Sequence, residues 1–141
     1  MLRAGLSVGQ RELAVACASH SGEAKHLEAV RAILDGNGLK ESQLQNTPAM
    51  PYGEEAMIEW ARGGGKACSL TQNCSGKHAA MLATCKINGW SLKDYLEPEH
   101  PLQRHIQATI EELCGELVAE TTVDGCGAPL HALTFHGLAK G

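Results

Sequence analysis

The sequence has few aromatic residues, no excess of basic charge and no long apolar run. Phenylalanine, tryptophan and tyrosine make up 4% of its 141 residues, and acidic and basic residues are interspersed to a formal net charge of -4. No basic stripe can follow a phosphate backbone, and no aromatic residues alternate with basic ones. No stretch approaches the length of a membrane-spanning helix. We therefore expect neither nucleic acid nor a membrane as a partner.

The sequence also lacks internal repeats, linker composition and the charged-then-apolar N-terminal pattern of a signal peptide. Its length is about that of one domain, and its hydrophobic content of 43% can supply a core. These features favour a globular protein in the cytoplasm.

The six cysteines do not indicate a disulfide framework, because their spacing is irregular and several lie in apolar helical patterns. In an intracellular chain this favours core thiols together with one metal-binding or catalytic pair. Cys74 and Cys126 are the two that lie in polar, Gly-rich motifs, and they are the candidate pair.

Hydrophobic periodicity predicts a mostly helical chain with few strands. Ser7 and Gln10 have capping-box spacing before the first helical run, and Pro48 and Pro51 favour an irregular loop over 44–53. His100-Pro101 should begin the longest helix, with a buried stripe of Leu102, Ile106, Ile110, Leu113 and Leu117. No clear element ends the chain. The expected helices cover 12–17, 24–34, 54–62, 74–87, 91–96 and a stretch from 100, and the expected short strands end at 123 and cover 130–135.

Three polar turns hold most of the chemically capable side chains: 18–23, 73–78 and 124–129. This distribution is typical of a site on loops carried by a helical scaffold. The Gly63-Gly64-Gly65 run lacks the spacing of a phosphate-binding loop, and we interpret it as a turn.

Cys74 stands where a loop becomes a helix, a position that favours a thiolate. Lys77 follows three residues later and shares its face, and Cys126 could approach from the third turn. Two thiolates and a neutral amine suit zinc. Two buried thiols beside a surface lysine explain the same pattern, so spacing alone leaves both readings open.

The other candidates also have alternative explanations. Ser19 and Ser21 flank His20, which suggests a serine nucleophile, but adjacent residues in a turn seldom point at one another, so the residues alone favour a Ser-rich helix cap. Asp124 fits a turn aspartate that bonds its own backbone or a substrate-binding group. Five further histidines show no metal-ligand spacing and are expected to be surface or packing residues: His26, His100, His105, His131 and His136.

Four blocks taken together resemble the signature motifs of the rhizobial-type, thermolabile L-asparaginase II family. They are Ala16-Cys17-Ala18-Ser19-His20-Ser21-Gly22-Glu23, Asn73-Cys74-Ser75-Gly76-Lys77-His78, His100-Pro101-Leu102-Gln103 and Val123-Asp124-Gly125-Cys126-Gly127-Ala128-Pro129. The resemblance runs in register over essentially the whole chain.

The resemblance implies a hydrolase that converts L-asparagine to L-aspartate and ammonia. It also implies an α/β fold similar to serine β-lactamases and penicillin-binding proteins, of which this chain would be mostly the helical part, and a homodimer. The family's zinc ligands fall on Cys74, Lys77 and Cys126, and its second active-site serine falls on Ser19. His20, His78 and Asp124 would lie on the substrate side.

The sequence departs from the family in three places. It contains no Ser-x-x-K motif upstream of the matched segment and no partner lysine downstream, and it has Asn46 and Ala49 where relatives tend to carry Cys and His. We therefore expect residues 1–141 to be a single partial domain, the middle of a longer enzyme, with impaired activity. A shortened gene product, a misassigned reading frame or a decayed copy would each account for this.

Two other functions are compatible with these residues. A non-catalytic, zinc-stabilised helical module would use His20 or His78 as a fourth ligand. A cysteine amidase would use Cys74 as its nucleophile.

Overall fold

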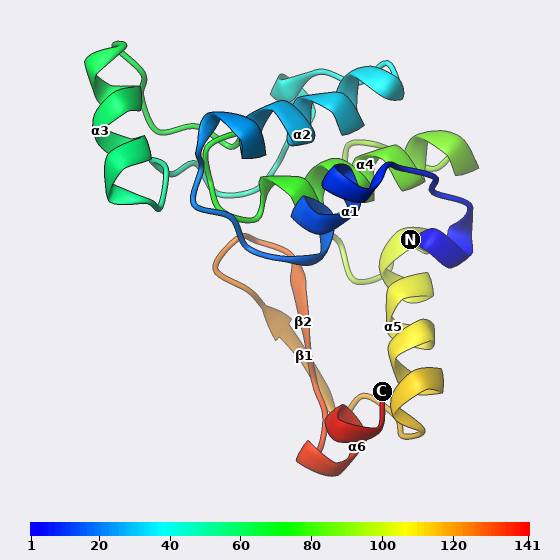
Figure 1. Cartoon of the computed structure of the whole chain (residues 1–141). Coiled ribbons are helices and arrows are strands. Elements are labelled where there is room, and N and C mark those ends of the chain that lie inside the picture. The colour runs from blue at the N-terminus through cyan, green and yellow to red at the C-terminus, as the bar shows by residue number, and fades with distance from the viewer.

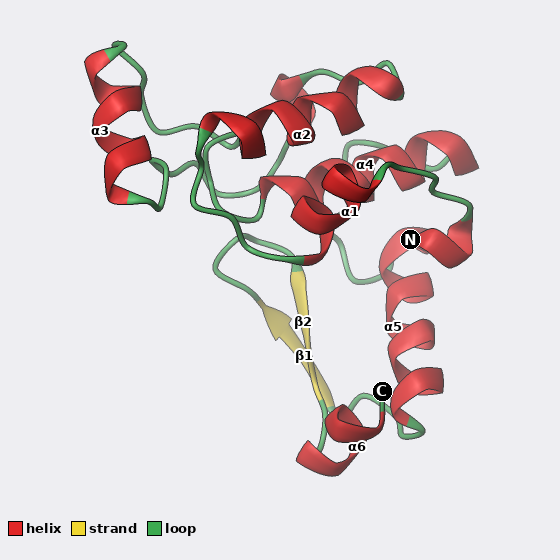
Figure 2. Ribbon diagram, viewed as in Figure 1, coloured by secondary structure: helices red, strands yellow, loops and turns green.

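The computed structural model describes all 141 residues as a mostly helical, mixed α/β fold with one small sheet (Figures 1 and 2). The sheet is a two-stranded antiparallel hairpin in which Glu120 pairs with Ala132 and Val123 with Pro129. The elements are α1 (Gln10–Cys17), α2 (Ala24–Gly36), α3 (Glu54–Arg62), α4 (Ser75–Asn88), α5 (Pro101–Cys114), β1 (Glu120–Val123), β2 (Pro129–Ala132) and α6 (Phe135–Lys140), with short 3-10 turns at Leu2–Ala4 and Glu41–Gln43.

Helix α4 is the centre of the core. Helices α1 and α2 both pack against it (Figure 1), and Ala79, Ala80, Leu82 and Ala83 are completely buried. From Ser75 to Cys85 the helix buries every residue except Lys77. Because α4 begins at the candidate site, the best-packed part of the molecule fixes that site.

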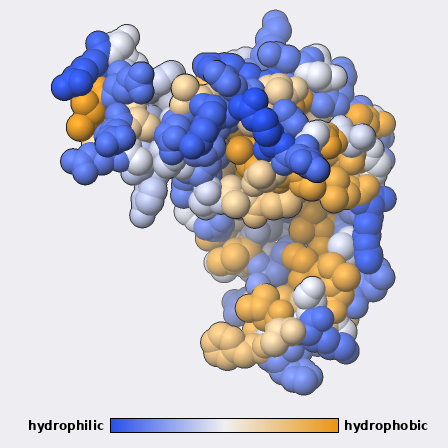
Figure 3. All heavy atoms as spheres, in the orientation of Figure 1, coloured by the Kyte–Doolittle hydropathy of each residue, from blue (hydrophilic) through white to orange (hydrophobic).

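Two parts of the chain project from this core. Helix α3 stands to one side, and the hairpin with α6 extends on another (Figure 1). Apolar side chains gather in the lower part of the molecule over these C-terminal elements (Figure 3), where Phe135 is 93% exposed and Leu117 80% exposed. Exposed apolar surface of this kind favours association or aggregation.

Most of the predicted elements are confirmed. Helices α1, α2, α3 and α4 form within the predicted ranges or within two residues of them, the segment 44–53 holds no strand, and the strand that ends at Val123 is present. Helix α2 buries its apolar face in the core through Leu27, Val30, Ile33 and Leu34.

Four predictions are wrong in detail. The capping box at Ser7 is absent, because α1 begins at Gln10 with Gly9 as its N-cap. Residues 91–96 form turns, since Tyr95 is drawn into the core and its hydroxyl bonds to His78. Helix α5 is no longer than α4, and β2 covers Pro129–Ala132 and not residues 130–135.

The buried stripe of α5 and the chain end also differ from prediction. Leu102 is buried, but Leu113 is 46% exposed, because only the start of α5 reaches the core. The helix ends at Gly115, which has a φ of 68° in the left-handed region that favours glycine. The chain then finishes in α6, which the hydroxyl of Thr134 caps by accepting a hydrogen bond from the backbone N–H of Gly137.

None of the helices combines the length and the hydropathy that crossing a bilayer requires. The β-lactamase-like fold, the single partial domain, the homodimer and the cytoplasmic location stay predictions.

Candidate metal centre and serine pocket

The N-terminus of α4 presents Cys74 at the surface of the core. Cys74 is the N-cap residue, but its side chain makes no capping bond, so the sulfur is free to face outward. Gly76, in the next turn, lies directly against the backbone of Val15 in α1. This contact between α1 and α4 fixes the direction in which Cys74 and Lys77 leave the helix.

The turn of the β1–β2 hairpin carries the second half of the site. The Oδ1 atom of Asp124 accepts a 2.7 Å hydrogen bond from the backbone N–H of Gly125, and the Asp124 backbone pairs with that of Ala128 at 2.8 Å. Gly127 has a φ of 90°, which a side chain would disfavour. The turn aspartate is thus confirmed, and the tight turn buries Cys126.

The two halves meet in one cluster. The Sγ atoms of Cys74 and Cys126 and a carboxylate oxygen of Asp124 all lie within 4.8 Å of one another. The Nζ atom of Lys77 lies 3.2 Å from Oδ2 of Asp124, and the Cys126 thiol donates to the same oxygen at 3.2 Å. Four side chains from two distant segments therefore converge, as the zinc hypothesis requires.

The electrostatics of the cluster keep Lys77 charged when no metal is present. Burial opposes this charge, but Cys126, Asp124 and Cys74 outweigh burial and raise the pKa of Lys77. The hydrogen bond from Cys126 lowers the pKa of Asp124, while burial raises the pKa of the Cys126 thiol. A metal ion would have to displace the protons of the amine and of both thiols.

Ser19 lies in the same pocket. A cavity of about 180 Å³ is lined by Ala16, Cys17, Ala18, Ser19, Cys74, Lys77 and Asp124. Ser21 is outside it, because its hydroxyl donates to Glu23 at 2.7 Å and lies 3.3 Å from Nδ1 of His26. Of the two serines in this turn, only Ser19 can reach a molecule bound beside the thiols.

The two candidate histidines lie behind this pocket and do not line it. His20 places Nε2 2.9 Å from the hydroxyl of Ser75, and His78 places Nδ1 2.9 Å from the hydroxyl of Tyr95. Neither belongs to the group of possible metal ligands, so no contact supports a histidine as a fourth ligand. Their substrate-binding role stays a prediction.

Acidification should destabilise the fold through these two histidines. Burial lowers the pKa of His20 and of His78 to about 4, whereas in the unfolded chain they titrate near 6.5. The unfolded chain therefore binds more protons as the pH falls through this interval, and stability present at pH 7 is lost from about pH 6.5 down to about pH 4. Each histidine should contribute about 3 kcal/mol at most.

Urea unfolding at a series of pH values measures this effect. The His78→Gln variant should lose part of the pH dependence, while His136→Gln, on the exposed surface, should keep all of it. Equal pH dependence in the two variants would contradict a buried, neutral His78.

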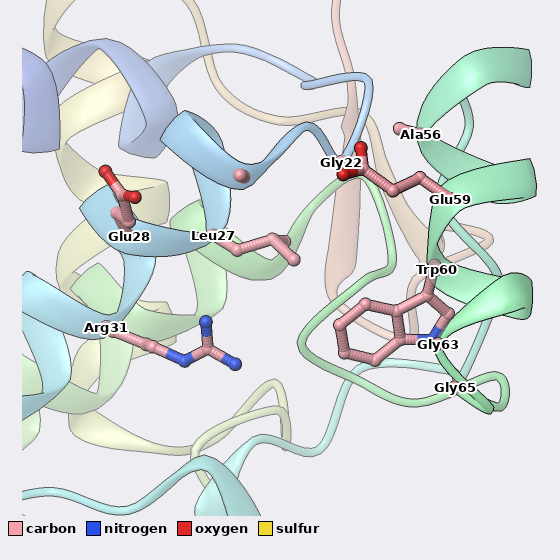
Figure 4. A pocket seen from close by; sticks show the side chains of 10 residues that line it. Gly22, Leu27, Glu28, Arg31, Ala56, Glu59, Trp60, Gly63 and Gly65 are labelled. Carbon is pink, nitrogen blue, oxygen red and sulfur yellow. The ribbon is translucent and has the colours of Figure 1, made fainter.

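A larger cavity lies between α2 and α3, away from the cluster. Its volume is about 350 Å³, and its walls include Leu27, Arg31 and Trp60 (Figure 4). Arg31 is paired with Glu41 at 2.7 Å, and the indole N–H of Trp60 donates to the Lys66 carbonyl at 3.0 Å. The charge of Arg31 is thus already paired, and no thiol or serine lines this cavity. We therefore do not take the cavity as the reaction site.

The sequence interpretation assigned Asp124 to the substrate side and missed its place among the possible metal ligands. The signal was present, since a carboxylate two residues before a cysteine in a tight turn can bind the same metal ion as that cysteine. The buried amide of Gln72 had no comparable signal, because it lies in no motif, and Asn46, also buried, stood out only as a departure from the family pattern.

The fold and the site define a mixed α/β protein that brings the Cys74 thiol, an amine, a carboxylate and a serine to one pocket, with the Cys126 thiol beside the carboxylate. A family model described as L-asparaginase II matches residues 1–141, the whole chain. The chain belongs to the L-asparaginase II family, which supports an asparaginase-type, amide-hydrolysing function. A search of curated proteins found no match.

Proposed function

We propose that this chain carries the zinc-binding and serine-bearing part of an L-asparaginase that hydrolyses L-asparagine to L-aspartate and ammonia. The observation that supports this most is the convergence of Ser19 with Cys74, Lys77 and Asp124 on one small pocket. Family membership supplies the reaction class. We further propose that the complete enzyme has the serine β-lactamase-like fold.

The residues present fit a zinc ion. Two sulfurs and one carboxylate oxygen lie within 4.8 Å of one another, and the amine of Lys77 lies beside that carboxylate. Soft thiolates with nitrogen or oxygen ligands are a donor set that zinc prefers. We propose Cys74, Lys77 and Cys126 as the ligands, and the bound zinc would orient neighbouring groups and the substrate.

The chain's own groups then have defined tasks. The Ser19 hydroxyl lines the pocket and is proposed to act on the substrate amide as the second active-site serine. Asp124 is placed to accept hydrogen bonds from a charged amino group, because its carboxylate is 40% exposed. His20 and His78 are proposed to contribute on the substrate side, and each is held in place by one hydroxyl, that of Ser75 for His20 and that of Tyr95 for His78.

The proposal is tested by measuring ammonia release from L-asparagine by the zinc-loaded chain. We expect slow turnover, because the sequence contains no Ser-x-x-K. Ser19→Ala should lower the rate by about 100-fold, the lower range for losing a group that takes part in proton transfer. Ser21→Ala is the matched control and should change it less than about twofold, because Ser21 lies outside the pocket.

Calorimetric titration with L-asparagine completes the test. The zinc-loaded chain should bind the substrate, and Asp124→Asn should weaken binding. A chain that binds zinc but neither binds nor hydrolyses L-asparagine would instead be a non-catalytic zinc module. Loss of activity on alkylation of Cys74 in metal-free protein would favour the cysteine amidase.

A further inference from the structure

The loop residues Asn46 and Thr47 are linked by hydrogen bonds to both halves of the thiol site, Asn46 through Gln72 and Thr47 directly. They lie between the 3-10 turn Glu41–Gln43 and α3, far in the sequence from either cysteine. Asn46 is only 1% exposed, although it belongs to a loop, and Thr47 is exposed. The buried Nδ2 of Asn46 donates two hydrogen bonds inside the protein, whereas its buried Oδ1 has no partner.

Asn46 reaches the Cys74 side through Gln72. The Oε1 atom of Gln72 accepts hydrogen bonds from the backbone N–H of Cys74 and from Nδ2 of Asn46, both at 2.9 Å. The second N–H of Asn46 donates to the carbonyl of Ser69 at 2.7 Å. Since only oxygen can accept these bonds, the orientation of both amides is determined, and together they fix the backbone at the start of α4.

Thr47 reaches the Cys126 side directly. Its hydroxyl donates to the carbonyl of Gly125 at 3.1 Å, and its backbone N–H donates to the carbonyl of Cys126 at 3.3 Å. Gln45, its neighbour but one, donates its N–H to the Tyr95 hydroxyl at 3.0 Å. Adjacent residues of one loop therefore hold the α4 start and the hairpin turn.

We propose that Asn46 and Thr47, together with Gln72, are positioning residues that set the separation of the Cys74 and Cys126 sulfurs. They touch neither sulfur and act through the backbone of the two cysteines. Without them the hydrogen bonds that join the hairpin turn to the α4 start through this loop would be gone, and the Lys77–Asp124 contact would be left to hold the two together. A ligand pair that needs one fixed separation would then bind a metal more weakly. This inference rests on the proposed function, because the fixed separation serves a zinc site. The first measurement below does not require zinc.

The first measurement uses metal-free protein and is independent of zinc. The chain is equilibrated with mixtures of reduced and oxidised glutathione, and the Cys74–Cys126 disulfide is quantified by mass spectrometry of the cross-linked peptides. The equilibrium gives the effective concentration of one thiol beside the other. Thr47→Val should lower it about three- to tenfold, the effect of losing one hydrogen bond, and Thr47→Ser should restore it.

The second measurement is the zinc dissociation constant, obtained by competition with a chromophoric chelator. Gln72→Met should raise it about 10- to 100-fold, as when a partner that orients a metal ligand is removed. Thr121 lies on the exposed strand β1, and Thr121→Val is the control for Thr47→Val. Gln103→Met, which removes a buried amide elsewhere, is the control for the glutamine change.

The outcomes separate the two proposals. If the wild-type chain binds no zinc but Thr47→Val and Gln72→Met lower the effective concentration, the positioning role stands and the zinc site fails. If the variants alter only the melting temperature, and the thiol equilibrium and zinc affinity match the controls, the loop supports the fold alone. A wild-type chain that forms no Cys74–Cys126 disulfide would also overturn the inference.

Discussion

Replacing Gly76 with alanine is expected to destabilise the protein by about 3 kcal/mol, a large cost for one added carbon in a packed core. The new Cβ would overlap the carbonyl oxygen of Val15 and lie 2.6 Å from its carbonyl carbon. Both are backbone atoms of α1, so the clash can be relieved only if the two helices separate. The gain of about 1 kcal/mol from alanine in a helix offsets part of this cost.

Urea unfolding compares this variant with Gly36→Ala, which adds the same methyl near the end of α2. No heavy atom lies within 4 Å of that position, so Gly36→Ala should be neutral or slightly stabilising. If the two variants unfold at the same urea concentration, the close approach of α1 and α4 is wrong.

Replacing Lys77 with arginine is expected to abolish zinc binding while preserving the fold. Arginine keeps the positive charge beside Asp124, but it does not lose its proton in proteins and so cannot be a metal ligand. Replacing Cys74 with serine should weaken zinc binding comparably. In both variants the zinc affinity should fall by more than the roughly 10- to 100-fold that is lost when the hydrogen-bond partner of a metal ligand is removed.

Chelator competition gives the affinity, and Cys17→Ser is the matched control. Cys17 is an exposed thiol that lines the same cavity but lies outside the group of possible ligands. The Cys17→Ser variant should therefore bind zinc with the affinity of the wild type. Normal zinc affinity in Lys77→Arg would make Lys77 a counterion of Asp124 and leave Asp124 as the third ligand.

The sequence predicted the elements that depend on local signals. Helix α3 begins after Gly53 and ends at Gly63 as its composition indicates, and Gly89 ends α4. Local signals failed where tertiary contacts decide. Tyr95 lies in a segment with helical composition, but burying its ring and bonding its hydroxyl hold that segment in turns.

The site was predictable to the extent that its residues lie in motifs. Motif resemblance assigns three residues to one site, Cys74, Lys77 and Cys126. The structure brings them together with Asp124. The direction of a side chain was not predictable: His20 and His78 lie in the same motifs yet point into the core. The loop at Asn46 and Thr47 contributes through long-range hydrogen bonds that no short sequence pattern encodes.

The central claim is that zinc is held by Cys74, Cys126 and Lys77 in an asparaginase-type pocket. X-ray absorption at the zinc edge, recorded on zinc-loaded protein, tests it most directly. The account predicts two sulfur neighbours at about 2.3 Å together with nitrogen or oxygen neighbours at about 2.0–2.1 Å. A zinc ion without sulfur neighbours, or a chain that retains no zinc, would contradict it.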